Sequence, residues 1–202
     1  NIFLLLLIPA MFGLLALQTG FIGYKLAVPF SCSLIILLSL RKTIGKNRDM
    51  LFVIAAFGFS MIGDYFLSNK RSNDLFFVYG IAAFWGAHFG YSVYAMKNGR
   101  WHRNALIVLT VVFLPYYFIF LYPAIASPLL SMSVFLYLAI SIIAFALALG
   151  LKHAGRHKLF FVLGIALILF SDTLISFNEF LRFRTFNDLI LPTYYLAHIS
   201  IT

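Results

Sequence analysis

Long uninterrupted apolar runs constrain the fold of this chain more than any other feature of its sequence. Residues 129–151 contain no charged side chain, and similar runs recur from one end of the chain to the other. A helix needs about 20 mostly apolar residues to cross the hydrocarbon core of a bilayer, whereas the strands of a membrane barrel alternate in polarity. The chain is 63% hydrophobic and 10% charged, far from the balance of a soluble domain. The sequence therefore predicts an all-α, polytopic transmembrane helical bundle.

Eight such segments predict about eight spans within a single transmembrane domain that covers residues 1–202. The segments are 2–17, 22–40, 50–68, 75–96, 104–122, 129–151, 158–178 and 187–202. The first and last are short for a span. The sequence also begins without Met and ends inside an apolar run, so we expect both ends to be trimmed.

Basic residues are concentrated in alternate loops, which predicts the orientation in the membrane. Ten of the 15 Lys and Arg residues follow the second, fourth and sixth segments, and five lie at the opposite ends of the helices. Basic loops favour the cytoplasmic side, so we expect these loops and both termini to be cytoplasmic, in the inner membrane if the source is a bacterium. Contacts with anionic lipid headgroups would account for the net charge of +9 without a nucleic-acid partner. The ten are Arg41, Lys42, Lys46, Arg48, Lys97, Arg100, Arg103, Lys152, Arg156 and Lys158, and the five are Lys25, Lys70, Arg71, Arg182 and Arg184.

When the residues at the loops and span ends are set aside, four ionisable side chains remain inside the predicted spans, namely Asp64, His88, Asp172 and His198, and Glu179 lies near the end of the seventh segment. A charge at the bilayer centre costs at least about 2.5 kcal/mol on insertion scales, so such residues usually face the protein interior and carry function. Simpler interpretations stay open. Asp64 is close to a helix end and could reach interfacial water, and His88 could be a hydrogen-bonded packing residue.

The spacing of these residues predicts an internal repeat of four plus four helices. Residues 63–68 and 171–176 share the pattern of a small residue, Asp, two further residues, an aliphatic residue and Ser. A His follows 24 residues after Asp64 and 26 residues after Asp172. We therefore expect halves of 1–100 and 101–202 that are related by an axis along the membrane normal. Both carboxyls would then lie at similar depth, and the two Asp and two His could share one cavity.

Hydroxyl side chains lie close to these residues on the same helix faces. One helical turn separates Ser60 from Asp64, Tyr91 from His88, Ser176 from Asp172 and Tyr194 from His198, and Ser171 is next to Asp172. These side chains, together with His88 and His198, are candidates for binding or orienting a substrate. Packing is the alternative for the tyrosines, because 18% of the chain is aromatic.

The motifs resemble the YhhN family of membrane proteins, which includes the animal lysoplasmalogenases. The resemblance covers nearly the whole chain. It rests on Gly63-Asp64, Ala87-His88-x-x-Tyr91, Phe170-Ser171-Asp172 and Tyr194-Tyr195-x-Ala197. The family usually has Gln after that last Ala, where this chain has His198, so the resemblance assigns no role to His198. It implies a hydrolase that takes a lysoplasmalogen from the bilayer and needs no cofactor. The enzyme would cleave the vinyl ether bond to give a fatty aldehyde and a glycerophospho-ethanolamine or -choline.

The implied reaction suits a pair of carboxyl groups. A vinyl ether is cleaved by protonation of its β-carbon, and water then captures the oxocarbenium ion. Two acids that share a low-dielectric pocket tend to divide into a protonated acid and a carboxylate, as in glycosidases. Asp64 and Asp172 would be the catalytic pair, with the deeper Asp172 favoured as the acid. His88 would orient an acid or bind the phosphate.

Two other functions fit the same residues. Intramembrane Asp and His residues in parallel repeats also predict a proton-coupled transporter or a lipid-binding protein. Two Asp and two His could instead bind a metal ion. A hydrolase would release aldehyde, a transporter would give flux across sealed vesicles without product, and a metal-dependent activity would be lost with a strong chelator. The oligomeric state is not indicated by the sequence.

Overall fold

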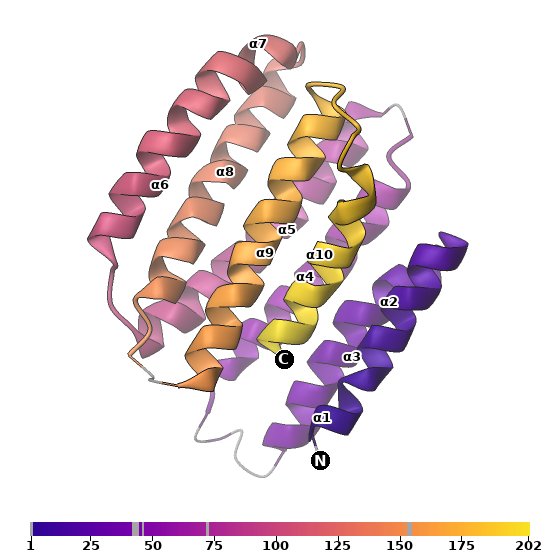
Figure 1. Ribbon diagram of the computed structural model, residues 1–202, viewed down its shortest axis with the longest axis vertical. Helices are drawn as coiled ribbons and strands as arrows, with labels where there is room; N and C mark the ends of the chain where they lie inside the picture. The colour runs from indigo at the N-terminus through magenta and orange to yellow at the C-terminus, as the bar shows by residue number, and fades with distance from the viewer. Residues whose placement is uncertain (1, 42–44, 46, 72, 153–154) are drawn as a thin grey trace.

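The computed structural model describes residues 2–41, 45, 47–71, 73–152 and 155–202. Lys42 and Lys46, two of the basic residues in the first basic loop, lie outside them. Within these ranges the chain is a bundle of roughly aligned helices (Figure 1), without a β-strand. The elements are α1 (Ile2–Leu5), α2 (Leu7–Thr19), α3 (Ile22–Leu40), α4 (Met50–Ser68), α5 (Asp74–Asn98), α6 (Arg103–Tyr116), the π-helical η1 (Tyr117–Leu121), α7 (Tyr122–Ala124), α8 (Pro128–Leu149), α9 (Arg156–Glu179) and α10 (Asn187–Ile201).

In this part of the chain the elements follow the eight predicted segments, with α1 and α2 sharing the first and α6, η1 and α7 sharing the fifth. Five of the described helices are long and apolar enough to cross a membrane, namely Ile22–Leu40, Met50–Ser68, Arg103–Ala124, Pro128–Leu149 and Arg156–Glu179. Their outer faces are apolar: Ile107, Val108 and Val111 of α6 are 60–66% exposed, as suits contact with lipid. The all-α bundle is confirmed, and the number of spans stays a prediction.

Local sequence signals explain where several helices begin and end. Asn73 accepts a hydrogen bond from the backbone N–H of Leu75 at the start of α5, and Ser127 accepts one from Leu130 at the start of α8. These are the side-chain types that satisfy the unpaired N–H groups of a helix N-terminus. Gly20 ends α2 with a φ of 66°, a left-handed conformation that glycine adopts without strain. The chain therefore turns sharply between α2 and α3.

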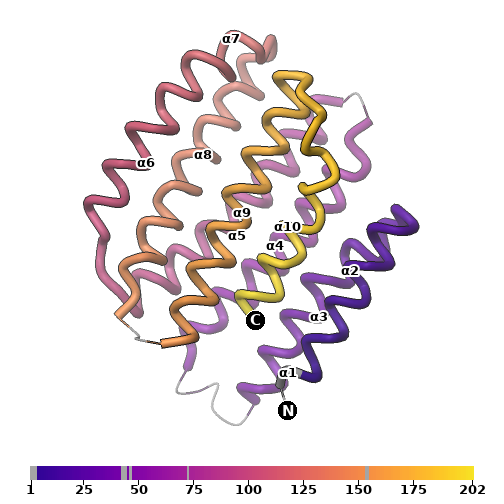
Figure 2. Tube along the Cα trace, viewed as in Figure 1, coloured from indigo at the N-terminus to yellow at the C-terminus, as the bar shows by residue number. Residues whose placement is uncertain are grey.

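Neighbouring helices pack in the same order in the two halves of the chain. Helices α2, α3, α4 and α5 contact one another in sequence, as do α6, α8, α9 and α10. The halves join where α5 packs on α8, and where α10 packs on α2 and α3. Figures 1 and 2 show α9 and α10 side by side across the face of the bundle. This order is what a four-plus-four arrangement predicts, while the repeat itself stays a prediction.

Small residues let the helices approach closely. A Cβ placed on Gly90 of α5 would lie 2.7 Å from the carbonyl oxygen of Phe52 on α4. A Cβ on Gly164 of α9 would lie 2.9 Å from the carbonyl oxygen of Ala197 on α10. Helix association in membranes depends on such close packing, because lipid offers little hydrophobic driving force between helices.

The two ends of the bundle differ. The start of α1 and the end of α10 lie at the same end of the bundle as the C-terminal ends of α3, α5 and α8 (Figure 1). An apolar core around Phe57, Tyr91 and Ile165 also fills the bundle toward this end. The end of α4, the start of α5 and residues 180–186 lie at the opposite end. Basic residues at helix ends, such as Arg41, Lys97 and Arg156, therefore lie at the same end of the bundle as the start of α1 and the end of α10, and the assignment of that end to the cytoplasm stays a prediction.

Candidate functional site

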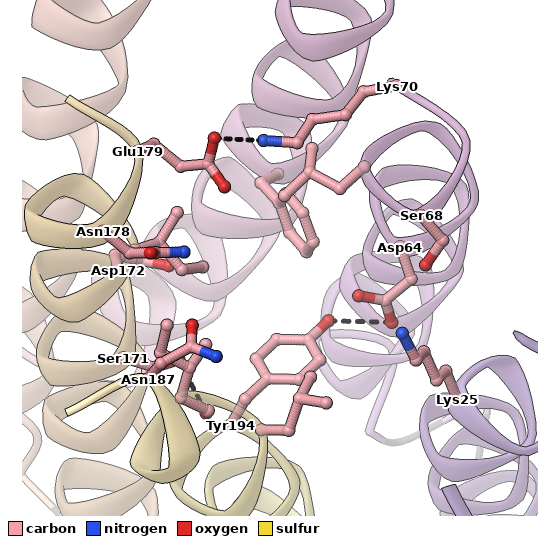
Figure 3. Close-up of a pocket in the computed structure, with 15 residues that line it drawn as sticks. Lys25, Asp64, Ser68, Lys70, Ser171, Asp172, Asn178, Glu179, Asn187 and Tyr194 are labelled. Carbon is pink, nitrogen blue, oxygen red and sulfur yellow. Dashed lines mark hydrogen bonds and ion pairs between the residues drawn. The ribbon is translucent and has the colours of Figure 1, made fainter. Parts of the chain in front are cut away.

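A pocket of about 270 Å³ lies at the end of the bundle opposite the termini and brings the two intramembrane acids together (Figure 3). Asp64 reaches it from α4 and Asp172 reaches it from α9. The other lining residues are Lys25, Leu67, Ser68, Lys70, Phe84, Ser171, Ile175, Asn178, Glu179, Asn187, Ile190, Leu191 and Tyr194. The acids of the two predicted halves thus face one cavity.

Asp64 is held by a tyrosine from the other half of the chain. The Tyr194 hydroxyl donates a hydrogen bond to Oδ2 of Asp64 at 3.1 Å. The Tyr194 ring packs edge-on against Phe84, with 6.0 Å between ring centroids, so the hydroxyl is directed at the carboxyl. Figure 3 shows the Lys25 side chain extending from α3 toward the same carboxyl. Asp64 therefore faces one hydroxyl and one ammonium group.

Asp172 is the first member of a hydrogen-bonded chain that runs into the protein core. The Tyr137 hydroxyl, from α8, donates to Oδ2 of Asp172 at 2.6 Å. Nε2 of His88, from α5, lies 2.9 Å from the same hydroxyl and 3.6 Å from Oδ2 of Asp172. A tyrosine has one hydroxyl proton, which is used toward Asp172, so His88 must donate its Nε2–H to the Tyr137 oxygen. Tyr137 thus links Asp172 to His88 through two hydrogen bonds.

This arrangement leaves the other nitrogen of His88 without a partner. The His88 side chain is 1% exposed, and its Nδ1 makes no hydrogen bond among the residues that the structure describes. An unpaired nitrogen in such a buried ring is costly, and Nε2 of His198 is unpaired in the same way. Tyr137 was missed by sequence reasoning, because nothing distinguishes it from the other ten tyrosines of this aromatic chain.

The remaining predicted site residues divide between the pocket lining and the core. Tyr194 and Ser171 line the pocket, and the Ser171 hydroxyl donates to the carbonyl oxygen of Ile190 at 3.0 Å, which ties α9 to α10. Ser60 and Tyr91 are buried behind the lining rather than in it, and the Ser60 side chain lies near the hydroxyls of Tyr91 and Tyr194.

His198 does not join the acids. It is fully buried, and its Nδ1 donates to the backbone carbonyl of Tyr194 at 2.9 Å. Its ring packs against Tyr194 and Phe57, at centroid distances of 4.4 and 5.2 Å. The expected convergence of two Asp and two His is therefore incomplete. His88 reaches Asp172 from behind, and His198 supports Tyr194 from the core.

The metal alternative requires a ligand set that these positions do not provide. Across the described ranges, no group of three or more His, Cys, Asp or Glu side chains lies close enough together to hold a metal ion.

The lining of the cavity changes from polar to apolar side chains at Asp172. A second, mostly apolar pocket of about 60 Å³ shares Asp172, Leu67, Phe84 and Ile175 with the first. Its further lining residues are Phe77, Ile81, Val134, Tyr137, Ser176 and Phe180, which come from α5, α8, α9 and the residue after α9. Asp172 therefore stands where a polar cavity meets an apolar one.

Comparison with known proteins gives a match to one family. No match was found among curated proteins or among solved structures. A family model, described as the YhhN family, matches residues 23–202. Because this match covers most of the chain, and because the motifs on which the resemblance rests lie within it, the protein belongs to the YhhN family.

Proposed function

We propose that this protein is a membrane-embedded hydrolase that cleaves the vinyl ether bond of lysoplasmalogen-type lysophospholipids and releases a fatty aldehyde. The observation that carries the proposal is the placement of Asp64 and Asp172 on one pocket whose lining passes from polar to apolar at Asp172. A lysolipid needs such a cavity, because it has a polar headgroup and an apolar chain. The resemblance to the lysoplasmalogenases of the family supports the choice of reaction.

The reaction needs one proton donor and one carboxylate. The protonated carboxyl delivers its proton to the β-carbon of the vinyl ether, and the electron pair of the double bond forms the new C–H bond. The adjacent carbon becomes part of an oxocarbenium ion, which the carboxylate stabilises. Water adds to that carbon, and a carboxylate accepts its proton. The hemiacetal then breaks into an aldehyde and the free hydroxyl of the glycerol backbone.

Hydrogen bonding favours Asp172 as the carboxylate. Tyr137 donates to it at 2.6 Å and in turn accepts a hydrogen bond from His88, and a short hydrogen bond of this kind stabilises an anion. Asp64 accepts a longer hydrogen bond, of 3.1 Å, from Tyr194, and it forms no ion pair with the Lys25 ammonium group that it faces. We therefore assign the proton donor to Asp64, the reverse of the assignment that depth alone favours.

The apolar and polar parts of the lipid would lie in the apolar and polar parts of the site. The alkenyl chain would enter through the apolar pocket between α5, α8 and α9, and the vinyl ether would lie between the two carboxyls. The glycerol and headgroup would occupy the polar cavity. Because the apolar pocket has a volume of only about 60 Å³, most of the chain would extend into the surrounding bilayer.

The test uses purified protein in lipid nanodiscs with a lysoplasmalogen, and it measures aldehyde. We expect turnover by the wild type and a loss of about 10²- to 10⁴-fold in Asp64→Asn and Asp172→Asn, the usual contribution of a positioned acid or base. Asp188→Asn is the matched control, because Asp188 is exposed in the first turn of α10 and does not line the pocket. Full activity in both pocket variants would refute the acid pair. Proton-coupled flux in sealed vesicles without aldehyde would favour a transporter.

A further inference from the structure

The mouth of the pocket carries charges that the proposed chemistry does not use. Lys25 comes from the first turn of α3, Lys70 lies just after α4, and Glu179 is the last residue of α9. Figure 3 shows the three side chains around the cavity, together with the amide groups of Asn178 and Asn187. Four parts of the chain, namely α3, the residues after α4, α9 and α10, thus place two cations, one anion and two amides around one opening.

Lys70 and Glu179 form an ion pair, and their side chains are 22% and 29% exposed. Lys70 also lies over the Phe77 ring, with its Nζ 4.4 Å from the ring centroid. Partly exposed pairs of this kind contribute little to stability, about 0–1 kcal/mol. The pair can therefore be exchanged for a charged ligand at little cost. Lys25 forms no ion pair of this kind among the described residues and points to the carboxyl of Asp64.

We infer that these residues form a binding subsite for a zwitterionic phosphodiester headgroup. Lys25 and Lys70 bind the phosphate, and Glu179 binds the ammonium group of the headgroup. The inference rests on the proposed function, because it places the polar part of the same lipid in the same cavity.

Charge balance selects the zwitterion over other headgroups. When it binds, Lys70 exchanges the Glu179 carboxylate for a phosphate, and Glu179 exchanges an ammonium group for another one. Each of the three side chains then has a group of opposite charge beside it. A headgroup with a phosphate but no amine would bind Lys70 in place of Glu179. The Glu179 carboxylate would then lie without a cation beside the phosphate anion, and this repulsion disfavours binding. A lipid without phosphate would leave the original pair intact and gain nothing from it.

The subsite also sets the position of the bond to be cleaved. In a lysoplasmalogen the three-carbon glycerol backbone separates the phosphate from the vinyl ether oxygen. Both lysines line the same cavity as Asp64 and Asp172. Fixing the phosphate at the mouth therefore limits how far the vinyl ether can move relative to the acids, which is how remote binding groups contribute to catalysis.

The test measures binding of three non-hydrolysable lipids to the protein in nanodiscs, so that it does not depend on turnover. The lipids are a 1-alkyl-lysophosphoethanolamine, a 1-alkyl-lysophosphoglycerol and a 1-alkylglycerol with the same chain. We expect Lys25→Gln and Lys70→Gln to weaken binding of both phospholipids about tenfold, or about 1.4 kcal/mol, and to leave the alkylglycerol unchanged. Glu179→Gln should weaken only the phosphoethanolamine lipid. Arg184→Gln is the matched control, since Arg184 is exposed at the same end of the bundle and lies outside the lining.

The pattern across ligands distinguishes this subsite from a purely structural ion pair. A structural pair would lower the thermal stability of the Lys70→Gln and Glu179→Gln variants and weaken all three lipids equally, and that result would overturn the inference. Unchanged binding of every lipid would also overturn it. Headgroup-selective binding without aldehyde release would refute the proposed hydrolase and leave the subsite standing. Aldehyde release together with headgroup-independent binding would refute the subsite and leave the proposed hydrolase standing.

Discussion

Tyr137→Phe is the most informative single substitution, because it removes one oxygen atom that links Asp172 to His88. The hydroxyl donates to Asp172 at 2.6 Å and accepts from His88 at 2.9 Å. The phenylalanine ring fills the same space, so the change isolates the two hydrogen bonds. If Tyr137 positions the carboxylate, its loss should lower kcat rather than raise KM, because the hydroxyl is used by Asp172 and His88 while the phenylalanine ring keeps the apolar lining that the alkenyl chain would contact.

The size of the effect follows from the bonds that are lost. A hydrogen bond to a charged group contributes about 1.5–3 kcal/mol, which corresponds to a fall of about 10- to 150-fold in kcat if all of it acts in the transition state. His88 would keep a buried Nε2–H with no acceptor beside a Nδ1 that is already unpaired. An unsatisfied buried donor costs about 1–3 kcal/mol, so the free energy of unfolding should fall by a similar amount.

Tyr117→Phe is the matched control for this substitution. Its hydroxyl is also buried, and it bonds to the carbonyl oxygen of Ser131 at 3.0 Å and to its side-chain oxygen at 2.7 Å, away from the acids. The control should lose stability and retain kcat. The assay is aldehyde release with kcat and KM determined separately, alongside thermal unfolding of each variant in detergent. Unchanged kcat in Tyr137→Phe, or an equal fall in both variants, would refute a positioning role for Tyr137.

Three further predictions concern Asp64, the core histidine and the helix contacts. Tyr194→Phe should lower kcat about three- to tenfold in the same assay, less than Tyr137→Phe, because its 3.1 Å bond to Asp64 is longer. His198→Gln should keep kcat within about threefold of wild type, because His198 lies behind the pocket lining; a larger loss would show that His198 acts on the site. Gly90→Ala should lower the unfolding temperature in a thermal melt, because its Cβ would lie 2.7 Å from the Phe52 carbonyl oxygen. Gly58→Ala, with open space at that position, should leave the temperature unchanged or raise it.

The helices could be predicted from the sequence because lipid imposes a single strong rule on apolar segments. A run such as 129–151 has no alternative to a helix in a bilayer, since every backbone polar group must be paired within the segment. The predicted boundaries agree with the observed helices to within a few residues, as for the predicted 158–178 and the observed Arg156–Glu179.

The convergence of Asp64 and Asp172 was also predictable, because charged residues are rare inside spans and their repeated motif implied equivalent positions. Neither the hydrogen-bond partners of the two acids nor the ion pair at the mouth of the pocket could be predicted from the sequence. Tyr137 lies on a helix with no ionisable motif, and its role depends on how α8 packs on α5 and α9. Lys70 and Glu179 are separated by 109 positions in the chain, and only the fold shows that they pair.

His198 shows the limit of spacing arguments. Its distance from Asp172 resembles that from Asp64 to His88, yet the two histidines face different surroundings. His88 lies where α5 packs on α8 and meets Tyr137. His198 lies on α10, and its side chain bonds to the backbone of that same helix and packs against Phe57. A sequence motif specifies which face of a helix is polar, whereas the neighbour of that face is set by packing between the two halves.

The most direct test of the central claim, that two carboxyls act as one catalytic unit on one lipid, is a double-mutant cycle on aldehyde release. We would compare Asp64→Asn, Asp172→Asn and the double variant under identical conditions. If the carboxyls are the two parts of one acid–base pair, each single variant should lose nearly all of the catalysed rate, and the double variant should lose little more. Losses that multiply in the double variant would show that the two residues act independently. Aldehyde release that persists in the double variant would contradict the account.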